Sequence, residues 1–316
     1  MEKLKVGVIG AGYLGRFHAE KYARMEDVDL VAVVDADEAA ARRTAEKCAA
    51  AAATDYRTLF GKVDAVSIVV PTALHFSISR DFLEHGVDVL IEKPMTASLE
   101  EADELIHIAE TRGLLIQVGH LERFNPAVLA LEGEAATPLF IESNRLSIYQ
   151  PRGTDVSVVL DLMIHDIDII LNLVRAETID IRAAGLPVIG NQVDIANARL
   201  AFAGGAVANV TASRVSLKNE RTLRLYQRDA FFAVDFAGRS ITVIRPGDPP
   251  DNDCPIPGMK MTQRRFDESD ALEDELRSFV RSVQDRREPE VTGKMGRDAL
   301  RVALSVMAQI DAHPRG

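Results

Sequence analysis

Three ionisable residues stand in apolar segments of the sequence, and their types fit acid–base catalysis. Lys93 follows the apolar run 89–91, whereas Asp161 and His165 interrupt the apolar stretch 158–171. Lysine is depleted in strands and is rarely buried without a partner. A carboxylate four residues before a histidine shares its helix face, orients the imidazole and favours its protonated form. This pattern predicts catalysis, with His165 as a general base, Asp161 orienting it and Lys93 alongside.

Each of these residues also has a structural interpretation. Lys93 could pair with Glu92 or Asp88, and a buried histidine is often a satisfied core residue. Asp168 extends the face of Asp161, so the stripe also has the spacing of a metal site. The stripe contains only one histidine, so we predict no metal site.

A phosphate-binding motif lies near the start of the chain. The GxGxxG segment 10–15 follows a strand-like run and opens a helix-like one. Gly10 allows a tight turn, Gly12 lets backbone N–H groups approach a pyrophosphate, and Gly15 lets helix and strand pack closely. The helix N-terminus adds a partial positive charge. The alternative is a glycine-rich turn without a ligand. The residues predicted to bind the phosphates are Gly10, Gly12, Tyr13, Leu14 and Gly15.

Asp35 makes the motif specific. It lies 20 positions after Gly15, at the end of the second strand-like run, where a carboxylate accepts hydrogen bonds from the ribose hydroxyls. A carboxylate there repels a 2′-phosphate, so the sequence predicts NAD rather than NADP. Arg42 and Arg43 could bind such a phosphate, but they are better explained as a solvated helix face.

The elements that must position these residues alternate in type over the first 120 positions. Nearly unbroken apolar runs are typical of a parallel sheet buried on both faces, and helix-like segments separate them. Ser98 and Glu101 form a capping box. We therefore predict a doubly wound α/β domain over residues 1–120. The expected strands are 6–9, 30–34, 63–70, 89–91 and 114–118, and the expected helices are 17–25, 38–51, 76–84 and 99–111.

The second half of the chain has a different pattern. The segments 195–202 and 207–211 alternate around Gly204-Gly205, and 223–226 and 231–236 flank a short turn, as antiparallel hairpins do. Residues 246–258 read as a long loop, and helices are expected at 158–171, 272–283 and 297–310. Residues 121–316 are therefore predicted to form an α+β domain with an open, mostly antiparallel sheet.

The composition of the chain argues against two classes of binding partner, nucleic acids and membranes. The chain has 316 residues and a net charge of −11, with 17 aromatic residues that include no tryptophan. Such a chain is a poor ligand for nucleic acid, because phosphate contacts need concentrated cations and stacking needs aromatic platforms. No apolar run is long enough to cross a membrane, and two distant cysteines form neither a disulfide framework nor a metal site. We expect a cytoplasmic protein.

Together these motifs resemble the glucose–fructose oxidoreductase/inositol dehydrogenase (Gfo/Idh/MocA) family. The resemblance rests on the GxGxxG strand, Pro71-Thr72 with His75, Glu92-Lys93-Pro94 and the Asp161-xxx-His165 helix, in that order. It implies a nicotinamide-dependent oxidoreductase that acts on a sugar or cyclitol hydroxyl. It also implies that the open sheet forms a homodimer or homotetramer. Carried over by position, Lys93 and His165 are catalytic, Asp161 assists, and Pro71, Thr72, His75 and Glu92 lie beside the cofactor.

One branch of the family is closer. The segment Gly119–Pro126, with Asp161 to Asp168, is similar to the UDP-N-acetylglucosamine 3-dehydrogenases. This implies oxidation at C3 of a UDP-N-acetylhexosamine, with Arg123 at the diphosphate and His120 or Asn125 at the sugar. Alternatively, Arg123 caps a linker helix and Asn125 starts the next one. The rival functions are a dehydrogenase of a free sugar or inositol and a catalytically silent NAD-binding protein.

Overall fold

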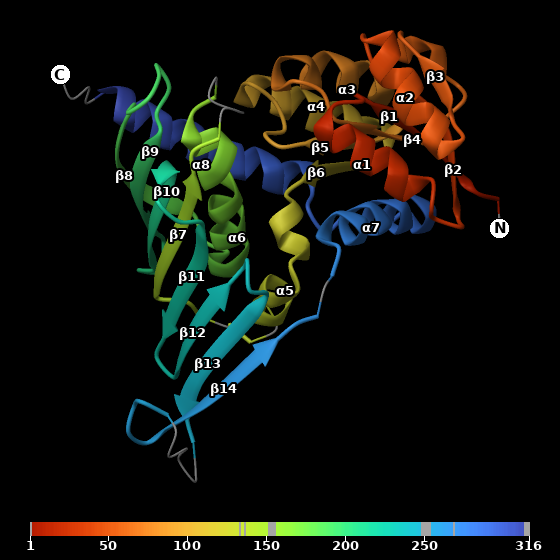
Figure 1. The fold of residues 1–316 in the computed structure, drawn as a ribbon. Helices are drawn as coiled ribbons and strands as arrows, with labels where there is room; N and C mark the ends of the chain where they lie inside the picture. Colours follow the sequence, from red (N-terminus) through yellow and green to blue (C-terminus); the bar gives the residue numbers. More distant parts are fainter. Residues whose placement is uncertain are drawn as a thin grey trace. The chain divides into compact units, whose positions relative to one another are not determined.

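The computed structural model describes residues 2–132, 134–135, 137–150, 156–247, 254–267 and 269–312 of the chain (Figure 1). It divides into two compact units, which we call the first and the second unit. The first contains Met1–Leu121 and Asp270–Leu300, and the second contains Glu122–Ser269 and Arg301–Gly316. The sequence predicted a second domain that contains all residues after 120. In the structure, residues 270–300 belong to the first unit instead.

The first unit is built on a six-stranded parallel sheet. Its strands are β1 (Leu4–Ile9), β2 (Val28–Val34), β3 (Ala51–Ala53), β4 (Ala65–Ile68), β5 (Asp88–Glu92) and β6 (Ile116–Gly119). They lie in the order β3-β2-β1-β4-β5-β6, so the direction of winding reverses between β1 and β4. The predicted doubly wound sheet is confirmed. The prediction of a helix through residue 51 was wrong, because α2 ends at Cys48 and Ala49 adopts a left-handed conformation.

Helices follow the strands as the apolar periodicity indicated. They are α1 (Tyr13–Tyr22), α2 (Glu38–Cys48), α3 (His75–Glu84) and α4 (Leu99–Arg112). The Ser98 hydroxyl accepts a hydrogen bond from the backbone N–H of Glu101, which confirms the cap. The Glu101 carboxylate accepts from the N–H of Ala97, one residue before the position that a capping box uses.

Helix α7 (Ala271–Asp285) explains why the first unit includes a segment from the end of the chain. Its apolar face, with Leu272, Leu276 and Phe279, joins the core that α1 and β1 also form. Polar contacts fix it further, because Gln117 Nε2 donates to the Glu275 carbonyl (3.1 Å) and the Arg286 guanidinium pairs with Asp88 (2.5 Å). The sheet would be left with an exposed apolar face without this helix.

The second unit contains an eight-stranded mixed sheet. Its strands are β7 (Phe140–Ile148), β8 (Thr178–Leu186), β9 (Ile195–Phe202), β10 (Val207–Ser216), β11 (Glu220–Gln227), β12 (Ala230–Asp235), β13 (Ser240–Pro246) and β14 (Met259–Arg265). Both predicted hairpins, β9–β10 and β11–β12, are present. The pair β7–β10 is parallel and the other pairs are antiparallel. Of the predicted loop 246–258, residues 248–253 lie outside the described part of the chain.

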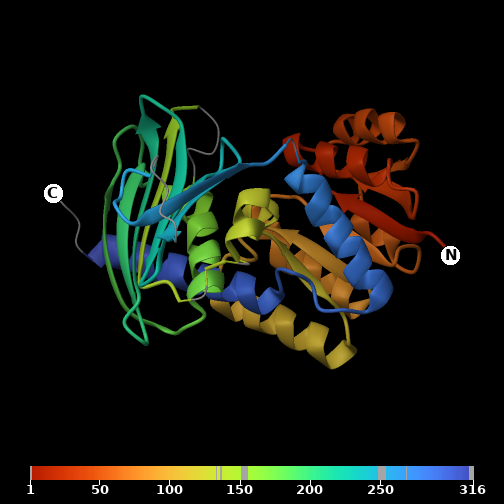
Figure 2. The same ribbon diagram turned by 90° about the horizontal axis from the view of Figure 1, so that it is seen from below.

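Helices of the second unit gather on one side of its sheet (Figure 2). They are α5 (Pro126–Glu132), a turn of π-helix (Val159–Met163) with α6 (Ile164–Val174) directly after it, and the later part of α8 (Gly293–Ala312). The buried positions of β11 alternate, with Leu223 and Leu225 on the helix side. The sheet therefore has one covered face and one face that carries no helix among the described residues.

Candidate functional site

The glycine motif forms the turn between β1 and α1, at the point where the sheet reverses its winding. Gly10 has a φ of +104°, and a Cβ on it would lie 2.1 Å from the Val69 carbonyl oxygen. A Cβ on Gly15 would lie 1.9 Å from the Gly10 carbonyl oxygen, whereas one on Gly12 would meet nothing within 4 Å. Gly10 and Gly15 thus permit the backbone packing. Gly12 faces open space at the start of α1, where a pyrophosphate would approach the helix N-terminus.

This difference predicts two separate effects of adding one methyl group. Gly15→Ala should lower the melting temperature of the unliganded protein, because its Cβ overlaps backbone. Gly12→Ala should leave that temperature almost unchanged and weaken NAD binding, because its Cβ occupies the space next to the helix N-terminus. Thermal unfolding with and without NAD measures both effects. Equal destabilisation by the two substitutions would contradict the assignment.

Asp35 is held in place by the glycine turn itself. Its Oδ2 accepts a hydrogen bond from the Ala11 backbone N–H (2.6 Å), and its Oδ1 accepts from the Asp37 N–H (2.9 Å). A carboxylate oxygen has a second lone pair, so both oxygens retain the capacity to accept from ribose hydroxyls. Tyr13, the first residue of α1, is 66% exposed, and Leu14 is half-buried. The structure thus brings the predicted adenosine-binding residues together.

The ends of β4, β5 and β6 carry the other predicted residues of the first unit. Pro71 and Thr72 follow β4, Lys93 follows β5, and His120 is buried just after β6. These positions and the glycine turn share the carboxyl edge of the sheet, where open α/β folds bind ligands. The structure therefore gathers them at one edge, while their roles remain predictions.

His75 has a structural task at this edge. Its ring lies buried between two backbone carbonyls, with Nδ1 2.9 Å from the Pro94 oxygen and Nε2 2.8 Å from the Val70 oxygen. It therefore connects the segment after β4 to the turn that carries Lys93. We assign His75 as a positioning residue for that turn.

A buried polar cluster lies beside Lys93 in the sequence. His18, on α1, is fully buried, and its Nε2 lies 3.2 Å from Glu92 Oε1. Glu92 covers Gly119, on which a Cβ would lie 3.0 Å from the carboxylate. Glu275, on α7, is also fully buried. Burial, with the charge of Glu92 adding to it, raises the pKa of Glu275 well above its usual value. The cluster therefore favours a neutral Glu275.

The raised pKa of Glu275 predicts a pH-dependent stability. In the unfolded chain the group ionises near pH ~4.3, whereas in the folded protein it keeps its proton to higher pH. The folded state then binds more protons, so this group lowers stability as pH rises through that window. Glu275→Gln cannot ionise, and its stability relative to the wild type should increase between about pH 5 and about pH 8. Urea unfolding at both pH values, with exposed Glu290→Gln as the control, measures this. A difference that stays constant with pH would contradict it.

Asp161 and His165 are both half-buried in the second unit. Asp161 lies in the turn of π-helix 159–163, and His165 lies in the first turn of α6. The expected uninterrupted α-helix is therefore wrong in its first turn, where the backbone is wound more widely. Such turns are frequent at functional sites. Asp168 is buried, and its Oδ2 lies 3.7 Å from Arg123 Nη1.

A buried arginine holds α6 to the sheet next to His165. The guanidinium of Arg145, on β7, donates to both carboxylate oxygens of Asp166 (2.8 and 3.0 Å) and to Glu122 Oε1 (2.7 Å). Burial alone would lower the pKa of Arg145, but the two carboxylates outweigh it and raise the pKa above the usual value. This network fixes the helix turn that carries His165.

Arg123 and Asn125 make contacts within the protein, as their structural interpretations predict. Arg123 is 6% exposed, and its Nε donates to Glu132 Oε1 (3.1 Å) while Asp168 lies on its other side. Asn125 Oδ1 accepts from the Ala127 N–H at the start of α5, and its Nδ2 donates to the Phe236 carbonyl. Both side chains therefore bind within the second unit. These contacts fit the structural alternatives, and the roles of Arg123 and Asn125 at a diphosphate and a sugar stay predictions.

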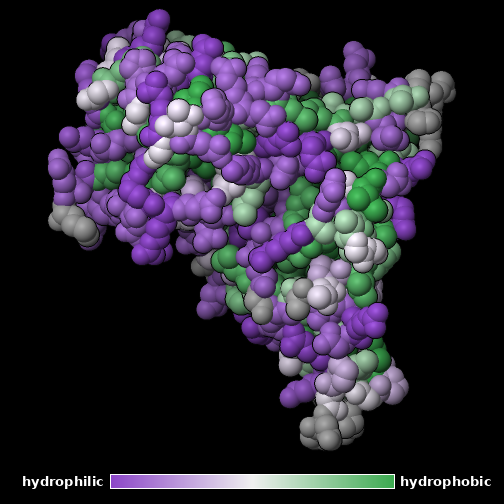
Figure 3. All heavy atoms as spheres, turned by 180° about the vertical axis from the view of Figure 1, so that it is seen from behind, coloured by the Kyte–Doolittle hydropathy of each residue, from purple (hydrophilic) through white to green (hydrophobic). Residues whose placement is uncertain are grey.

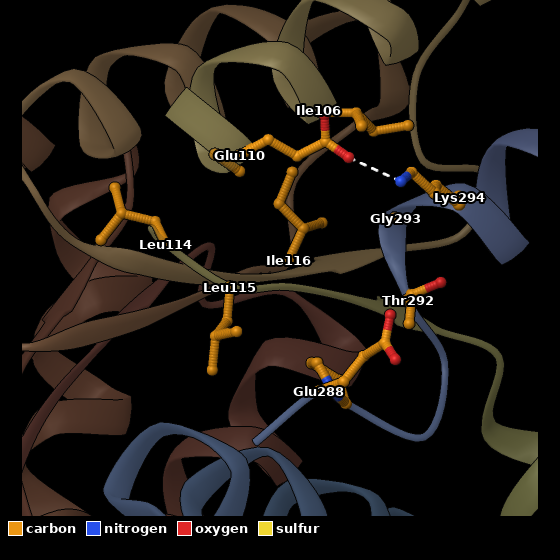
Figure 4. Close-up of a pocket in the computed structure, with 11 residues that line it drawn as sticks. Ile106, Glu110, Leu114, Leu115, Ile116, Glu288, Thr292, Gly293 and Lys294 are labelled. Atoms are coloured by element: carbon orange, nitrogen blue, oxygen red, sulfur yellow. Dashed lines mark ion pairs between the residues drawn. The ribbon is translucent and has the colours of Figure 1, made fainter. Parts of the chain in front are cut away.

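The first unit also contains a pocket of about 110 Å³ that lies away from the glycine turn (Figure 4). Leu114 and Ile116, at the beginning of β6, line it, and Glu110 pairs with Lys294 across it (2.6 Å). The beginning of a parallel strand lies at the opposite edge from the glycine turn. The pocket is therefore separate from the predicted cofactor site, and its two charges already neutralise each other.

Sequence reasoning missed two of these residues, His18 and Glu275. Both are buried ionisable groups, and only Glu275 had a signal, as a carboxylate within the apolar stripe of α7. Across the described residues, no three His, Cys, Asp or Glu side chains form a group that could hold a metal ion.

Two family models match the chain. One, an oxidoreductase family with an NAD-binding Rossmann fold, covers residues 4–120, and the other, a Gfo/Idh/MocA C-terminal domain, covers 132–231. UDP-N-acetylglucosamine 3-dehydrogenase of Acidithiobacillus ferrooxidans is 37% identical over 99% of both chains. Inositol 2-dehydrogenase of Rubrobacter xylanophilus is 31% identical over 68% of this chain and 66% of its own.

Solved structures agree with this assignment. A structure of the Acidithiobacillus ferrooxidans 3-dehydrogenase superposes with a TM-score of 0.94 at 36% identity, covering 99% of each chain. A levoglucosan dehydrogenase in complex with NADH has a TM-score of 0.87 at 18% identity, covering 98% of each chain, and shares the fold. The glycine turn, Asp35 and the paired sheets thus belong to a known architecture. The chain is a member of the Gfo/Idh/MocA family of oxidoreductases, with NAD as its cofactor.

Proposed function

We propose that this oxidoreductase oxidises the C3 hydroxyl of a UDP-linked N-acetylhexosamine to a ketone. The observation that carries the proposal is the 37% identity, over 99% of both chains, to a UDP-N-acetylglucosamine 3-dehydrogenase. The positions of Lys93 directly after β5 and of His165 on α6 support it, since each follows or lies on an element of the fold.

In this mechanism the chain's residues move a proton and stabilise charge. His165 takes the proton of the sugar hydroxyl as general base, and Asp161 keeps its imidazole oriented. The Lys93 ammonium stabilises the oxygen as negative charge develops on it. NAD, when bound, accepts the hydride. Asp35 binds the adenosine ribose, and the backbone at Gly12 with the N-terminus of α1 binds the pyrophosphate.

The position of Asp35 predicts the choice between the two nicotinamide cofactors. Because its carboxylate is fixed beside the glycine turn by the Ala11 and Asp37 N–H groups, it cannot move away from a 2′-phosphate without losing hydrogen bonds. NAD should bind more tightly than NADP, and Asp35→Ala should narrow the difference. Titration of both cofactors into both proteins measures this. Tighter binding of NADP by the wild type would contradict it.

A direct assay distinguishes the proposed substrate from its main rival. The match to an inositol 2-dehydrogenase, at 31% identity over 68% of this chain, supports a free cyclitol or sugar as the alternative. The assay follows NADH absorbance with UDP-N-acetylglucosamine, with free N-acetylglucosamine and with inositol. We expect turnover of the nucleotide sugar. Turnover of inositol or a free sugar, with no binding of the nucleotide sugar, would replace the proposal by the alternative.

We further propose that the chain acts as a homodimer or homotetramer in the cytoplasm. The helix-free face of the second sheet supports self-association, because it carries an aromatic group in which Tyr226 contacts Phe140 and Phe231, with ring centroids 5.9 and 4.9 Å apart. Figure 3 shows hydrophobic residues reaching the surface in patches among polar ones. Cys48 and Cys254 are free thiols, and within the described part no helix is long and apolar enough to cross a membrane.

A further inference from the structure

A second pocket lies wholly within the second unit, next to the helix turn that carries Asp161. Its volume is about 410 Å³, within the size range of small-molecule sites. Asp161 and Leu162 line it from the π-helical turn, Arg214 from β10, and Asn219 and Arg221 from the β10–β11 connection and β11. The pocket thus extends from a proposed catalytic residue to two arginines.

Arg214 and Arg221 differ in how many of their hydrogen-bond donors are available to a ligand. Arg214 is buried, and its guanidinium lies 3.6 Å from Asp194 and donates to the Val156 carbonyl. The side chain of Arg221 is 52% exposed. Its ion pair among the described residues is with Glu122, at 3.6 Å, and Glu122 is bound more closely by Arg145 (2.7 Å). Arg221 therefore keeps donors for a ligand, whereas Arg214 forms part of the wall.

The register of the sheet places Arg221 on the side of the catalytic helix. Arg221 lies directly opposite Arg145 across the β11–β7 pair, and Arg145 binds Asp166 of α6. Side chains directly opposite each other share a face, so Arg221 is on the covered face. Arg224, three positions later, is opposite Glu142 and points to the other face. The two arginines of one strand thus face different surroundings.

The acidic residue of the pocket next to Arg221 does not compete for it. The Glu220 carboxylate pairs with Lys218 (2.6 Å) and accepts a hydrogen bond from the Thr222 hydroxyl (3.2 Å). These contacts lower the pKa of Glu220, with the Lys218 bond as the main cause. The charge of Glu220 is thus already compensated within the hairpin, and Arg221 can act on a ligand.

We propose that this pocket is the diphosphate subsite of the enzyme and that Arg221 binds the diphosphate of the nucleotide sugar. The inference rests on the proposed function. A guanidinium presents parallel N–H donors that match two oxygens of a phosphate. Arg221 thereby holds the nucleotide end of the substrate while the sugar extends toward Asp161 and His165. It replaces Arg123, which is buried between two carboxylates, as the diphosphate ligand.

The test compares Arg221→Gln and Arg221→Lys with Arg224→Gln, whose side chain is 51% exposed on the same strand. Steady-state kinetics with UDP-N-acetylglucosamine and inhibition by UDP and by UMP are measured for each. Loss of a charge-assisted contact should raise KM and the UDP inhibition constant about ten- to hundredfold in Arg221→Gln, with kcat little changed. Arg221→Lys should recover part of the affinity, Arg224→Gln should resemble the wild type, and the preference for UDP over UMP should fall in Arg221→Gln.

The outcomes separate this inference from the proposed function. If the wild type oxidises the nucleotide sugar but Arg221→Gln and Arg224→Gln behave alike, the subsite is wrong and the function stands. If the wild type does not oxidise it but binds UDP through Arg221, the subsite stands and the sugar or reaction is wrong. If the wild type binds neither UDP nor the nucleotide sugar, both are overturned.

Discussion

His165→Ala and Lys93→Met are each expected to reduce kcat by on the order of 10²-fold or more, because positioned acid–base and charge-stabilising groups contribute that much. His165→Ala removes the base that takes the hydroxyl proton. Lys93→Met keeps most of the side-chain volume and removes the charge that stabilises the alkoxide. NAD affinity should change little in both, since the adenosine half of the cofactor is bound at Gly12 and Asp35. Steady-state kinetics and NAD titration measure the two effects separately.

Matched controls exist for both substitutions. Lys62→Met removes an exposed lysine before β4, and His107→Ala removes an exposed histidine of α4. Neither should change turnover. Near-normal turnover in Lys93→Met or in His165→Ala would remove that residue from the mechanism. A loss of NAD binding equal to the loss of turnover would show that the residue serves the cofactor rather than the reaction.

Arg145→Met is expected to destabilise the protein by roughly 3–5 kcal/mol, the usual effect of removing one partner of a buried ion pair. The substitution leaves Asp166 charged, 1% exposed and without the guanidinium that binds both of its oxygens. The effect should appear in the free energy of unfolding measured with urea. Arg182→Met is the control, because Arg182 is 76% exposed and pairs with the exposed Asp180, a kind of pair that contributes about 0–1 kcal/mol.

A double variant tests the cause of this destabilisation. In Arg145→Met with Asp166→Asn the buried carboxylate is neutral, so part of the lost stability should return even though more contacts have been removed. If the double variant is less stable than Arg145→Met by the full effect of Asp166→Asn alone, the two residues do not act as a pair. The stability of α6 would then depend on apolar packing rather than on this network.

Local patterns were sufficient wherever chemistry depends on neighbours in the sequence. The glycine motif predicted both the conformation of Gly10 and the close packing at Gly15, because these follow from one strand–turn–helix unit. The apolar runs predicted the strands β1, β2, β4, β5 and β6, because a strand buried on both faces has few polar positions. Ser98 predicted the start of α4, because a helix cap accepts its hydrogen bond from a residue only two or three positions later.

Contacts between residues far apart in the chain could not be predicted from the sequence. Arg123 and Asp168 are 45 positions apart, and Arg145 and Asp166 are separated by 21, so no local pattern shows that their charges neutralise each other. A buried ion pair and two separate charged residues on the surface cannot be distinguished in a sequence. The polar residues of segment 119–126 therefore suggested substrate contacts, whereas the structure places Arg123 and Asn125 inside the second unit. Arg221 became distinctive only when its strand partner was known.

The sequence by itself determined the strand–turn–helix that binds a dinucleotide, the acidic residue that favours NAD, the doubly wound sheet and the two hairpins. Each of these depends on backbone conformation and apolar periodicity over a few neighbouring residues. Only the tertiary structure decided that α7 belongs to the first unit, that His18, Glu92 and Glu275 form a buried cluster, and which arginines are free to bind a ligand. These depend on burial and pairing between distant segments, because the energy of a charge is set by the groups that surround it rather than by its place in the chain.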